Sequence, residues 1–228
     1  MLIPEELPLL LPRADGRQES ASGYRSYAAI AALIVDLAAA GRVTLSDDKD
    51  PKLHLTSADP TGDIVLDAAL PELQKRDGKT FSGIVAWTPL DPRDAVTKKL
   101  IDAGVLELGE RGFFGLGAHR TPEVDPHPEA RIRARLSDVI AGRRDATSAD
   151  RALLAILQAT HAARSILKEE TRELSSSELR KRIDEIVESG PDGDAAGDAI
   201  ERAVQQLTMS IVLTTVIPVV IAGTVTGS

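Results

Sequence analysis

Apolar residues recur every three or four positions along most of this chain, which is the spacing of one face of an α-helix. Residues 26–40 show the pattern clearly, and Gly41 follows where it stops. The apolar stripe consists of Tyr27, Ile30, Ile34 and Leu37. Ser26 can cap the start of this helix, and glycine ends helices because it adopts the left-handed conformation without a Cβ penalty. The spacing predicts further helices at residues 64–73, 93–103, 130–141, 148–168 and 169–189, and a last helix that begins within 198–207.

One unit, a helix followed by a stopping glycine and a short β-hairpin, occurs twice. The first copy comprises Leu37–Leu45 and Leu53–Leu55, and the second comprises Leu100–Leu108 and Phe113–Leu116. Alternating apolar residues after the glycine suit a half-buried strand. The second hairpin places two of the three phenylalanines beside the Gly-Glu-Arg-Gly turn at 109–112. We therefore expect an apolar hairpin that is exposed in part.

Three segments lack a helical period. Leu7–Leu11 is a short apolar run closed by Pro12, which predicts a strand or an extended segment. Residues 81–86 are apolar but fit either a strand or a helix. Residues 119–128 contain three prolines and are expected to be irregular.

Composition narrows the fold class. The 228 residues are 43% hydrophobic but only 3% aromatic, so the core must be built from Leu, Ile, Val and Ala, which favours helices over a β-sandwich. The net charge of -8 argues against broad non-specific binding of nucleic acid. Cysteine is absent, which excludes disulfides, thiolate zinc sites and thiol nucleophiles. The acidic, proline-broken start does not resemble a signal peptide, and we expect a cytoplasmic protein.

The C-terminal tail admits two interpretations. No charged residue follows Arg202, and residues 209–225 are largely apolar. This length of about 17 residues is the lower limit for a helix that spans a bilayer. No basic cluster flanks the segment, so we favour a final helix or strand buried in the core over a membrane anchor.

The sequence offers little for catalysis. His119, Asp125 and His127 lie close together, but the prolines between them do not define a metal geometry. Ser148 is a plausible N-cap of the strongest predicted helix, and His161 in the middle of that helix is interpreted as a hydrogen-bonded core residue. Neither a Gly-rich phosphate loop nor a nucleophile elbow is present. We expect a protein that is not an enzyme and has no cofactor and no metal site.

The second hairpin supports two binding interpretations. It is similar to the wing of a winged-helix DNA-binding module, but the helix before it lacks the clustered Lys and Arg that phosphate neutralisation requires. The alternative is a membrane-surface module, in which Phe113, Phe114 and Leu116 insert at the headgroup boundary. The basic residues that would meet anionic lipid are Arg111, Arg120, Arg131, Arg133 and Arg135. If the hairpin alternates as a strand does, one phenylalanine packs inward instead.

The order of several segments resembles the Golgi phosphoprotein 3 family, and the resemblance covers nearly the whole chain. The resembling segments are Glu5–Leu11, Leu33–Val43, Pro60–Asp63 with Leu66–Leu70, Trp87–Leu90, Leu100–Leu106 with the following hairpin, and Asp150–Ala162. The resemblance implies one mainly α domain over residues 1–228: a central helical bundle surrounded by amphipathic helices, with short β-hairpins. It also implies that the C-terminal segment packs into the fold.

The resemblance implies a peripheral membrane protein that binds phosphatidylinositol 4-phosphate and grips the tails of other proteins. Its phosphate pocket takes an aromatic and an arginine from the first helix and an arginine pair three residues apart. Arg93 matches one member of that pair and Leu90 falls on the other. The first-helix arginine falls on Ile30, and the aromatic falls near Tyr24 or Tyr27. With one arginine of three kept, a phosphate site is expected to be much weaker. The composition is typical of a bacterial-type member.

These observations predict a cytoplasmic protein that associates peripherally with anionic membrane lipids, including phosphoinositides as candidate ligands. The headgroup-binding residues are predicted to be Arg93, Arg131, Arg133 and Arg135. The hairpin residues predicted to insert or to oligomerise are Arg111, Phe113, Phe114 and Leu116. The alternative is an interaction adaptor that self-associates through the hairpin, with a protein partner that the sequence does not identify. Nucleic acid is not an expected ligand.

Overall fold

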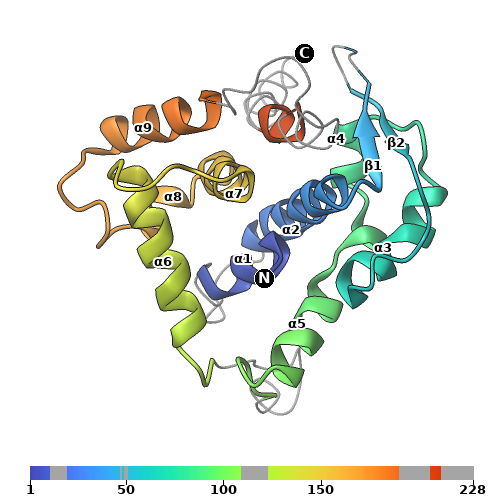
Figure 1. The fold of residues 1–228 in the computed structure, drawn as a ribbon, viewed down its shortest axis with the longest axis horizontal. Helices are drawn as coiled ribbons and strands as arrows, with labels where there is room; N and C mark the ends of the chain where they lie inside the picture. Colours follow the sequence, from blue (N-terminus) through green and yellow to red (C-terminus); the bar gives the residue numbers. More distant parts are fainter. Residues whose placement is uncertain (11–19, 47, 49–50, 109–122, 190–205, 212–228) are drawn as a thin grey trace, which may run out of the picture.

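A computed structural model of the chain describes residues 1–10, 20–46, 48, 51–108, 123–189 and 206–211, and within them it is mainly helical with one two-stranded sheet (Figure 1). The mainly α prediction is confirmed. The elements in chain order are α1 (Ile3–Leu10), α2 (Ser20–Ala39), β1 (Val43–Leu45), β2 (Leu53–Leu55), α3 (Ile64–Gln74), α4 (Phe81–Val85), the 3₁₀ helix η1 (Thr88–Leu90), α5 (Arg93–Asp102), α6 (His127–Ile140), α7 (Ser148–Ala159), α8 (Ala163–Ile166) and α9 (Ser176–Glu188). Residues 206–211 are also helical.

The core is organised around α1 and α2. Figure 1 shows these two helices in the middle of the molecule, with α6 and α9 on one side and α3 and α5 on the other. The second half of α2 is buried almost continuously from Ala28 to Val35, and α7 is buried from Ala152 to Leu157. Small alanines alternate with leucine and isoleucine in both helices, which lets neighbouring helices approach closely. The core is therefore aliphatic, as the composition indicated, with Phe81 as its one fully buried aromatic side chain among the described residues.

The prediction of a strand near Leu7–Leu11 is wrong, because α1 is a helix. Ile3, Leu7 and Leu10 lie at helical spacing and are each 2% exposed. The intervening Glu5 and Glu6 are also buried, so the segment has no polar face from which a helical period can be recognised. The position of α1 between other helices, and not its local pattern, decides its conformation.

The first predicted hairpin is confirmed. β1 and β2 pair antiparallel with Thr44 opposite His54, and Gly41 before them has a φ of 68°, which favours glycine. The other edge of β2 is covered by the turn after α3. The N–H of Gly78 donates to the Leu53 carbonyl at 2.8 Å, and the N–H of Leu53 donates to the Lys79 carbonyl at 2.9 Å. The turn after α3 is thereby fixed against the hairpin.

Several helix boundaries differ from those that the sequence predicted. α2 begins at Ser20, so Ser26 lies within the helix and is not its cap. α6 begins at His127, inside the segment expected to be irregular, because Pro126 and Pro128 suit a first helical turn. The helix predicted from 169 begins only at Ser176, after the cap Ser175.

The long helix predicted for 148–168 is divided in two. α7 ends at Ala159, and His161 beyond it has a φ of 55° and is exposed, so the prediction of a core histidine is wrong. Thr147, not Ser148, is the N-cap. Its hydroxyl accepts the Asp150 N–H at 3.1 Å, and the Asp150 carboxylate accepts the Thr147 N–H at 3.0 Å. This reciprocal pair satisfies N–H groups that the first turn leaves without helical partners.

Candidate functional site

Arg93 lies in the first turn of α5, beside α2. Its Nε donates to Asp91 Oδ2 at 2.6 Å, and its backbone N–H donates to Asp91 Oδ1 at 3.1 Å. The Ser26 hydroxyl of α2 donates to the same Oδ2 at 2.6 Å. The Arg93 side chain is 54% exposed, and its two terminal amino groups make no hydrogen bond to the described residues. Asp91 therefore orients Arg93 and offsets its charge, while two donors remain directed to solvent or a ligand.

The structure places the neighbouring positions of this site in the core. Ile30 is 0% exposed and Leu90 is 2% exposed, and both belong to the hydrophobic core. These are the positions at which the resemblance expects arginines. Tyr27 is partly buried against the core, and the side chain of Tyr24 lies outside the described part of the structure. Arg93 is thus the one arginine at these matched positions.

The three α6 arginines face different surroundings. Arg131 is exposed and makes no ion pair with the described residues. Arg133 donates to Glu129 Oε1 at 2.7 Å, to Glu170 Oε1 at 3.3 Å and to the Ile166 carbonyl. Its side chain therefore links α6 to the end of α8 and does not project freely.

Arg135 is half-buried and contacts two buried carboxylates. Its Nη1 and Nη2 donate to the two carboxylate oxygens of Glu6 at 2.9 and 2.5 Å, and its Nε lies 2.7 Å from the buried Asp150. The hydrogen bonds to Glu6 raise the pKa of Arg135 further above its ordinary value, against the opposing effect of burial. Arg135 thereby joins α1, α6 and α7, and this pairing holds the buried carboxylate of Glu6 in place.

A second acidic cluster holds the other side of α1. Lys99 of α5 donates to Glu5 and to Asp63, both at 2.5 Å. Asp36 of α2 accepts the Ile3 N–H at 2.7 Å. Burial raises the pKa of Asp36 to about 7, helped by the nearby Glu6 and Glu5 and opposed by the hydrogen bond from Ile3. The cluster therefore contains a carboxyl group that titrates near neutral pH.

The segments on either side of residues 109–122, here called the hairpin stem (residues 105–108 and 123–124), carry exposed apolar side chains, and their described partner Glu123 lies beyond the strand predicted at 113–116. Leu106 and Glu123 form an antiparallel bridge, and the Val124 N–H donates to the Val105 carbonyl at 3.0 Å. Leu108 is 57% exposed and Val124 is 52% exposed. A half-buried strand was predicted here; Leu106 is buried and Leu108 is exposed, and pairing within the described stem is limited to this bridge. The predicted hairpin residues Arg111, Phe113, Phe114 and Leu116 lie outside the described residues, as does Arg120.

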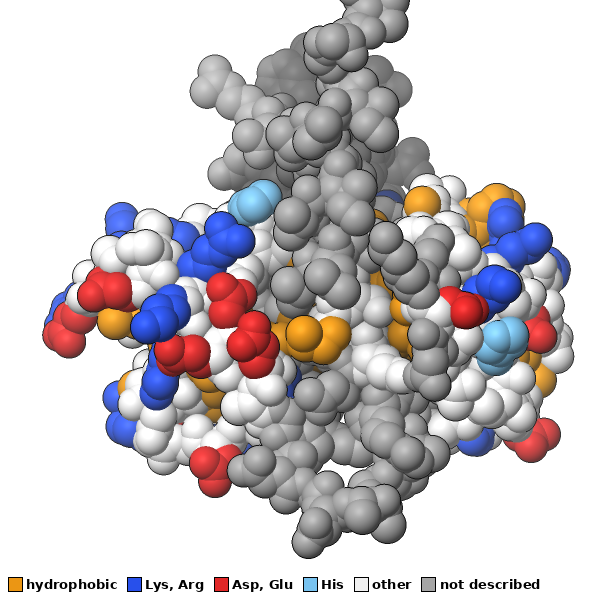
Figure 2. Space-filling view, turned by 90° about the horizontal axis from the view of Figure 1, so that it is seen from above, with side chains coloured by type: hydrophobic (Ala, Val, Ile, Leu, Met, Phe, Trp, Pro, Cys, Tyr) orange, Lys and Arg blue, Asp and Glu red, His pale blue; other side chains and the backbone are white. Residues whose placement is uncertain are grey.

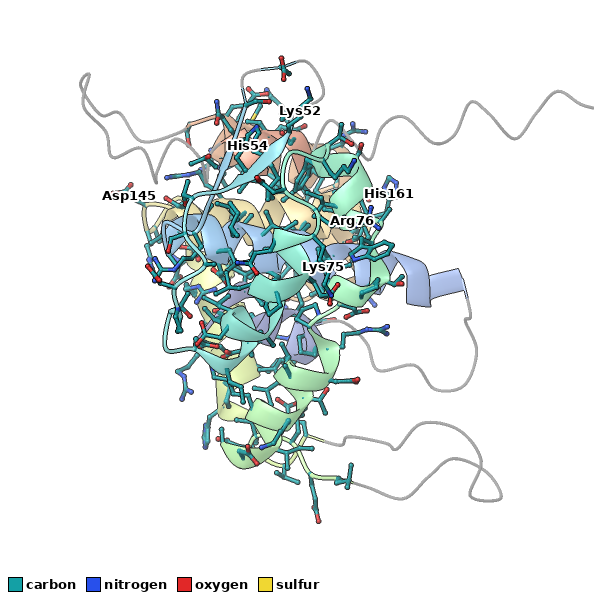
Figure 3. The ribbon with its side chains drawn as sticks, turned by 90° about the vertical axis from the view of Figure 1, so that its right-hand side faces the viewer. Lys52, His54, Lys75, Arg76, Asp145 and His161 are labelled. Atoms are coloured by element: carbon teal, nitrogen blue, oxygen red, sulfur yellow. The ribbon has the colours of Figure 1, made fainter. Side chains whose placement is uncertain are left out.

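Sequence reasoning missed a pair formed by Arg76, which follows α3, and Trp87, the residue before η1. The guanidinium carbon of Arg76 lies 3.4 Å from the centroid of the Trp87 ring. Figure 3 views this face, with Lys75 and Arg76 below Lys52 and His54 of the hairpin. The sequence showed a cation-rich turn and, further along, a single tryptophan. That the two side chains meet depends on the packing of α3 against η1, which the sequence pattern does not contain.

Other chemistry has little support in the described residues. Among them, no group of three or more His, Asp or Glu side chains is arranged to hold a metal ion. His127 donates its backbone N–H to Asp125 at 3.0 Å, and His119 lies outside the described part. On the face seen in Figure 2, acidic and basic side chains are interspersed and do not form one field of a single sign. None of the helices in the described ranges is both long and apolar enough to cross a membrane.

Comparison with known proteins identifies one family. The family model described as Golgi phosphoprotein 3 (GPP34) matches residues 3–207. The match therefore includes α1 with its buried carboxylates, the Arg93 site and the hairpin stem. A comparison with curated proteins gives no match.

Proposed function

The chain belongs to the Golgi phosphoprotein 3 family, and from this premise we propose that it binds anionic membrane surfaces peripherally and is not an enzyme. The observation that carries the proposal is the hydrogen bonding of the Arg93 side chain. Its Nε is fixed by Asp91 while its two terminal amino groups are free of described partners. A guanidinium group with two parallel donors matches a phosphate oxygen pair. Arg93 is the best headgroup contact that this surface offers.

The end of the molecule near the hairpin stem supports a membrane-facing orientation. α5 ends and α6 begins at the same end of the molecule (Figure 1). Leu108 and Val124 expose apolar surface there, and Arg131 is exposed in the first half of α6. Exposed apolar groups next to basic residues favour the interface between headgroups and acyl chains. Arg111, Phe113, Phe114 and Leu116 follow Leu108 in sequence and are assigned to insertion in the same proposal.

The arginines differ in their availability for lipid. Arg93 and Arg131 are exposed, and each basic residue near an anionic surface contributes about 1 kcal/mol. Arg133 and Arg135 are engaged by buried or partly buried carboxylates, so moving them to a headgroup would leave acids without partners. The proposal therefore assigns headgroup contact to Arg93 and Arg131, and assigns Arg133 and Arg135 to holding helices together.

The proposed lipid preference is for negative charge and not for one headgroup. A selective phosphate pocket uses several converging charged donors. Here Ile30 and Leu90 are core residues, and Asp91 offsets the charge of Arg93. We expect similar affinity for phosphatidylserine and for phosphatidylinositol 4-phosphate vesicles of equal surface charge.

Co-sedimentation with vesicles tests the proposal. The full chain is expected to bind anionic vesicles at low salt, to bind less at physiological salt, and not to bind neutral vesicles. Arg93→Gln is expected to weaken binding about fivefold, matching the loss of one basic contact. Lys98→Gln is the matched control, because Lys98 is an exposed cation of the same helix that pairs with Asp102 at 2.6 Å. If both variants lose the same vesicle affinity, Arg93 contributes only its positive charge and not a specific headgroup contact.

The hairpin requires its own variant. Phe113→Ala/Phe114→Ala is expected to keep the wild-type circular dichroism spectrum and to lose vesicle binding at physiological salt, where insertion has to supplement screened charge. A folded double variant that binds as well as the wild type would remove insertion from the proposal.

A second candidate function is self-association through the same stem. The exposed Leu108 and Val124 favour it, because exposed apolar side chains also suit a protein interface. Size-exclusion chromatography with light scattering separates the two candidates. An oligomer that becomes a monomer when residues 109–122 are replaced by a short glycine-serine linker would favour the adaptor over the membrane protein.

A further inference from the structure

Arg76 differs from every other half-buried arginine in the described residues. Those other arginines donate side-chain hydrogen bonds to carboxylates, carbonyls or hydroxyls within the protein: Arg42, Arg133, Arg135, Arg151 and Arg164. Arg76 makes no such bond and no ion pair to the described residues, and its guanidinium lies over Trp87 instead. A partly desolvated guanidinium without acceptors is costly in a folded protein unless a ligand or solvent supplies them.

The stacking leaves the donors of Arg76 usable. A guanidinium that lies 3.4 Å from a ring centroid uses its face for the aromatic contact. Its N–H groups lie in the guanidinium plane and so remain available at the edge. The ring thus restricts the rotamers of a long side chain before any ligand arrives, which lowers the entropy lost on binding. Trp87 also has a buried Nε1–H that donates to no described residue.

A second cation lies in the same turn. The Lys79 N–H donates to the Arg76 carbonyl at 3.0 Å, which closes a turn that brings the two residues close together. Lys79 is exposed and pairs with no acid among the described residues. Of the neighbouring acids, Glu72 pairs with Lys75 at 2.5 Å, and Asp77 accepts the Leu55 N–H at 2.9 Å and lies 3.7 Å from His54 Nδ1. Lys75, Arg76 and Lys79 outnumber Glu72 and Asp77, so this segment carries a net positive charge.

We propose that Arg76, held by Trp87, and Lys79 form a binding site for a phosphate monoester. A fork of two donors with an added point charge suits a group that has about two negative charges and three acceptor oxygens better than it suits a single carboxylate. The phosphate can belong to a soluble metabolite or to the headgroup of a lipid such as phosphatidic acid. This site is separate from Arg93 and does not depend on the membrane function proposed above.

The competing explanation is that Arg76 only stabilises the end of α3. Cations favour the C-terminal end of a helix, and Lys75 is the C-cap residue of α3. On that explanation, Arg76→Gln lowers the stability of the protein, and phosphate has no preference for this turn. A binding measurement on folded variants distinguishes the two explanations, because a purely structural cation does not recognise a soluble anion.

The single tryptophan of the chain makes the experiment specific. The full chain is titrated with glycerol 3-phosphate, with succinate as a dicarboxylate of similar charge, and with potassium chloride at matched ionic strength. Trp87 emission reports on the wild type, and calorimetry compares the wild type with the variants. Vesicles that contain phosphatidic acid are compared with phosphatidylserine vesicles of equal surface charge, because the membrane function proposed above predicts equal binding to the two. We expect saturable binding of glycerol 3-phosphate, or stronger binding to phosphatidic acid than to phosphatidylserine, and no saturable response to succinate or chloride.

The variants determine the assignment. Arg76→Gln is expected to weaken phosphate binding about tenfold, as the loss of charge-assisted hydrogen bonds predicts. Arg76→Lys keeps the charge but loses the fork, and is expected to weaken it in part. Lys75→Gln is the matched control and is expected to bind as the wild type does. The proposal is overturned if glycerol 3-phosphate does not bind and phosphatidic acid is not preferred over phosphatidylserine, if succinate binds equally well, or if Lys75→Gln loses as much affinity as Arg76→Gln. Weaker vesicle binding by Arg93→Gln with an intact response to glycerol 3-phosphate would separate this site from the membrane function.

Discussion

Replacing Asp36 by asparagine is expected to stabilise the protein at alkaline pH and to leave its stability unchanged in acid. Asp36 lies between α2 and α1, accepts the Ile3 N–H, and faces Glu5, Glu6 and the N-terminal amino group. Burial raises its pKa from 3.8 to about 7. Its protonated form is therefore favoured in the folded protein, and ionising it there costs free energy.

The sign follows from proton binding. Between pH 4 and 7 the folded protein holds a proton on Asp36 that the unfolded chain has released, so the free energy of unfolding falls as pH rises through this range. A pKa change from 3.8 to about 7 corresponds to ~4 kcal/mol in total, at 1.36 kcal/mol for each pH unit. The asparagine side chain of the Asp36→Asn variant does not ionise and keeps an oxygen that can accept the Ile3 N–H. The gain in stability should therefore approach ~4 kcal/mol at pH 8 and vanish near pH 4.

Urea unfolding followed by circular dichroism measures this gain at pH 4, 5.5, 7 and 8. All other titrating groups are shared by wild type and variant, so the difference between the two curves isolates Asp36. Asp94→Asn is the control for removing a carboxylate elsewhere, because Asp94 is exposed on α5. A difference for Asp36→Asn that is the same at pH 5.5 and pH 8 would refute the reasoning, since it would mean that Asp36 is ionised throughout.

Two further predictions concern stability. Glu6→Gln removes a buried carboxylate partner from the half-buried Arg135 and should destabilise the protein by about 3–5 kcal/mol; a loss below 1 kcal/mol in urea unfolding would show that solvent replaces Glu6. Thr147→Ala removes the cap of α7 and should cost about 1 kcal/mol, whereas Ser148→Ala, at the position that the sequence favoured, should cost less. Thermal unfolding compares these two variants, and the reverse order would contradict the capping geometry.

Much of the fold follows from local pattern. The helical period over residues 26–40 predicted most of α2, and Gly41 predicted its end and the turn into the first hairpin. These predictions were correct because an amphipathic stripe and a left-handed glycine each depend on only a few neighbouring residues. The predicted helix ends were less accurate at two places. At His127, prolines form part of a first helical turn, and at α7 the N-cap is Thr147 and not the adjacent Ser148.

The candidate site was predicted only in part. Arg93 was identified from the sequence, but the role of Asp91 and Ser26 in holding it was not, because Ser26 and Asp91 are separated by 65 positions. The predicted headgroup role of Arg133 and Arg135 rested on their position in a basic helix. Whether a cation on a helix faces solvent or a carboxylate depends on what packs against that helix, which a local pattern does not contain.

The sequence by itself determined that the chain is mainly helical, where the first hairpin lies, and to which family the chain belongs, because periodicity, turn residues and ordered motifs are read along the chain. Only the tertiary structure decided that α1 is a buried helix, that Arg135 pairs with Glu6 across 129 positions, and that Arg76 lies on Trp87. These features depend on burial and on charges from distant segments. Burial raises the energetic cost of every unpaired charge, and so it sets which side chains are engaged within the protein and which remain available for a ligand.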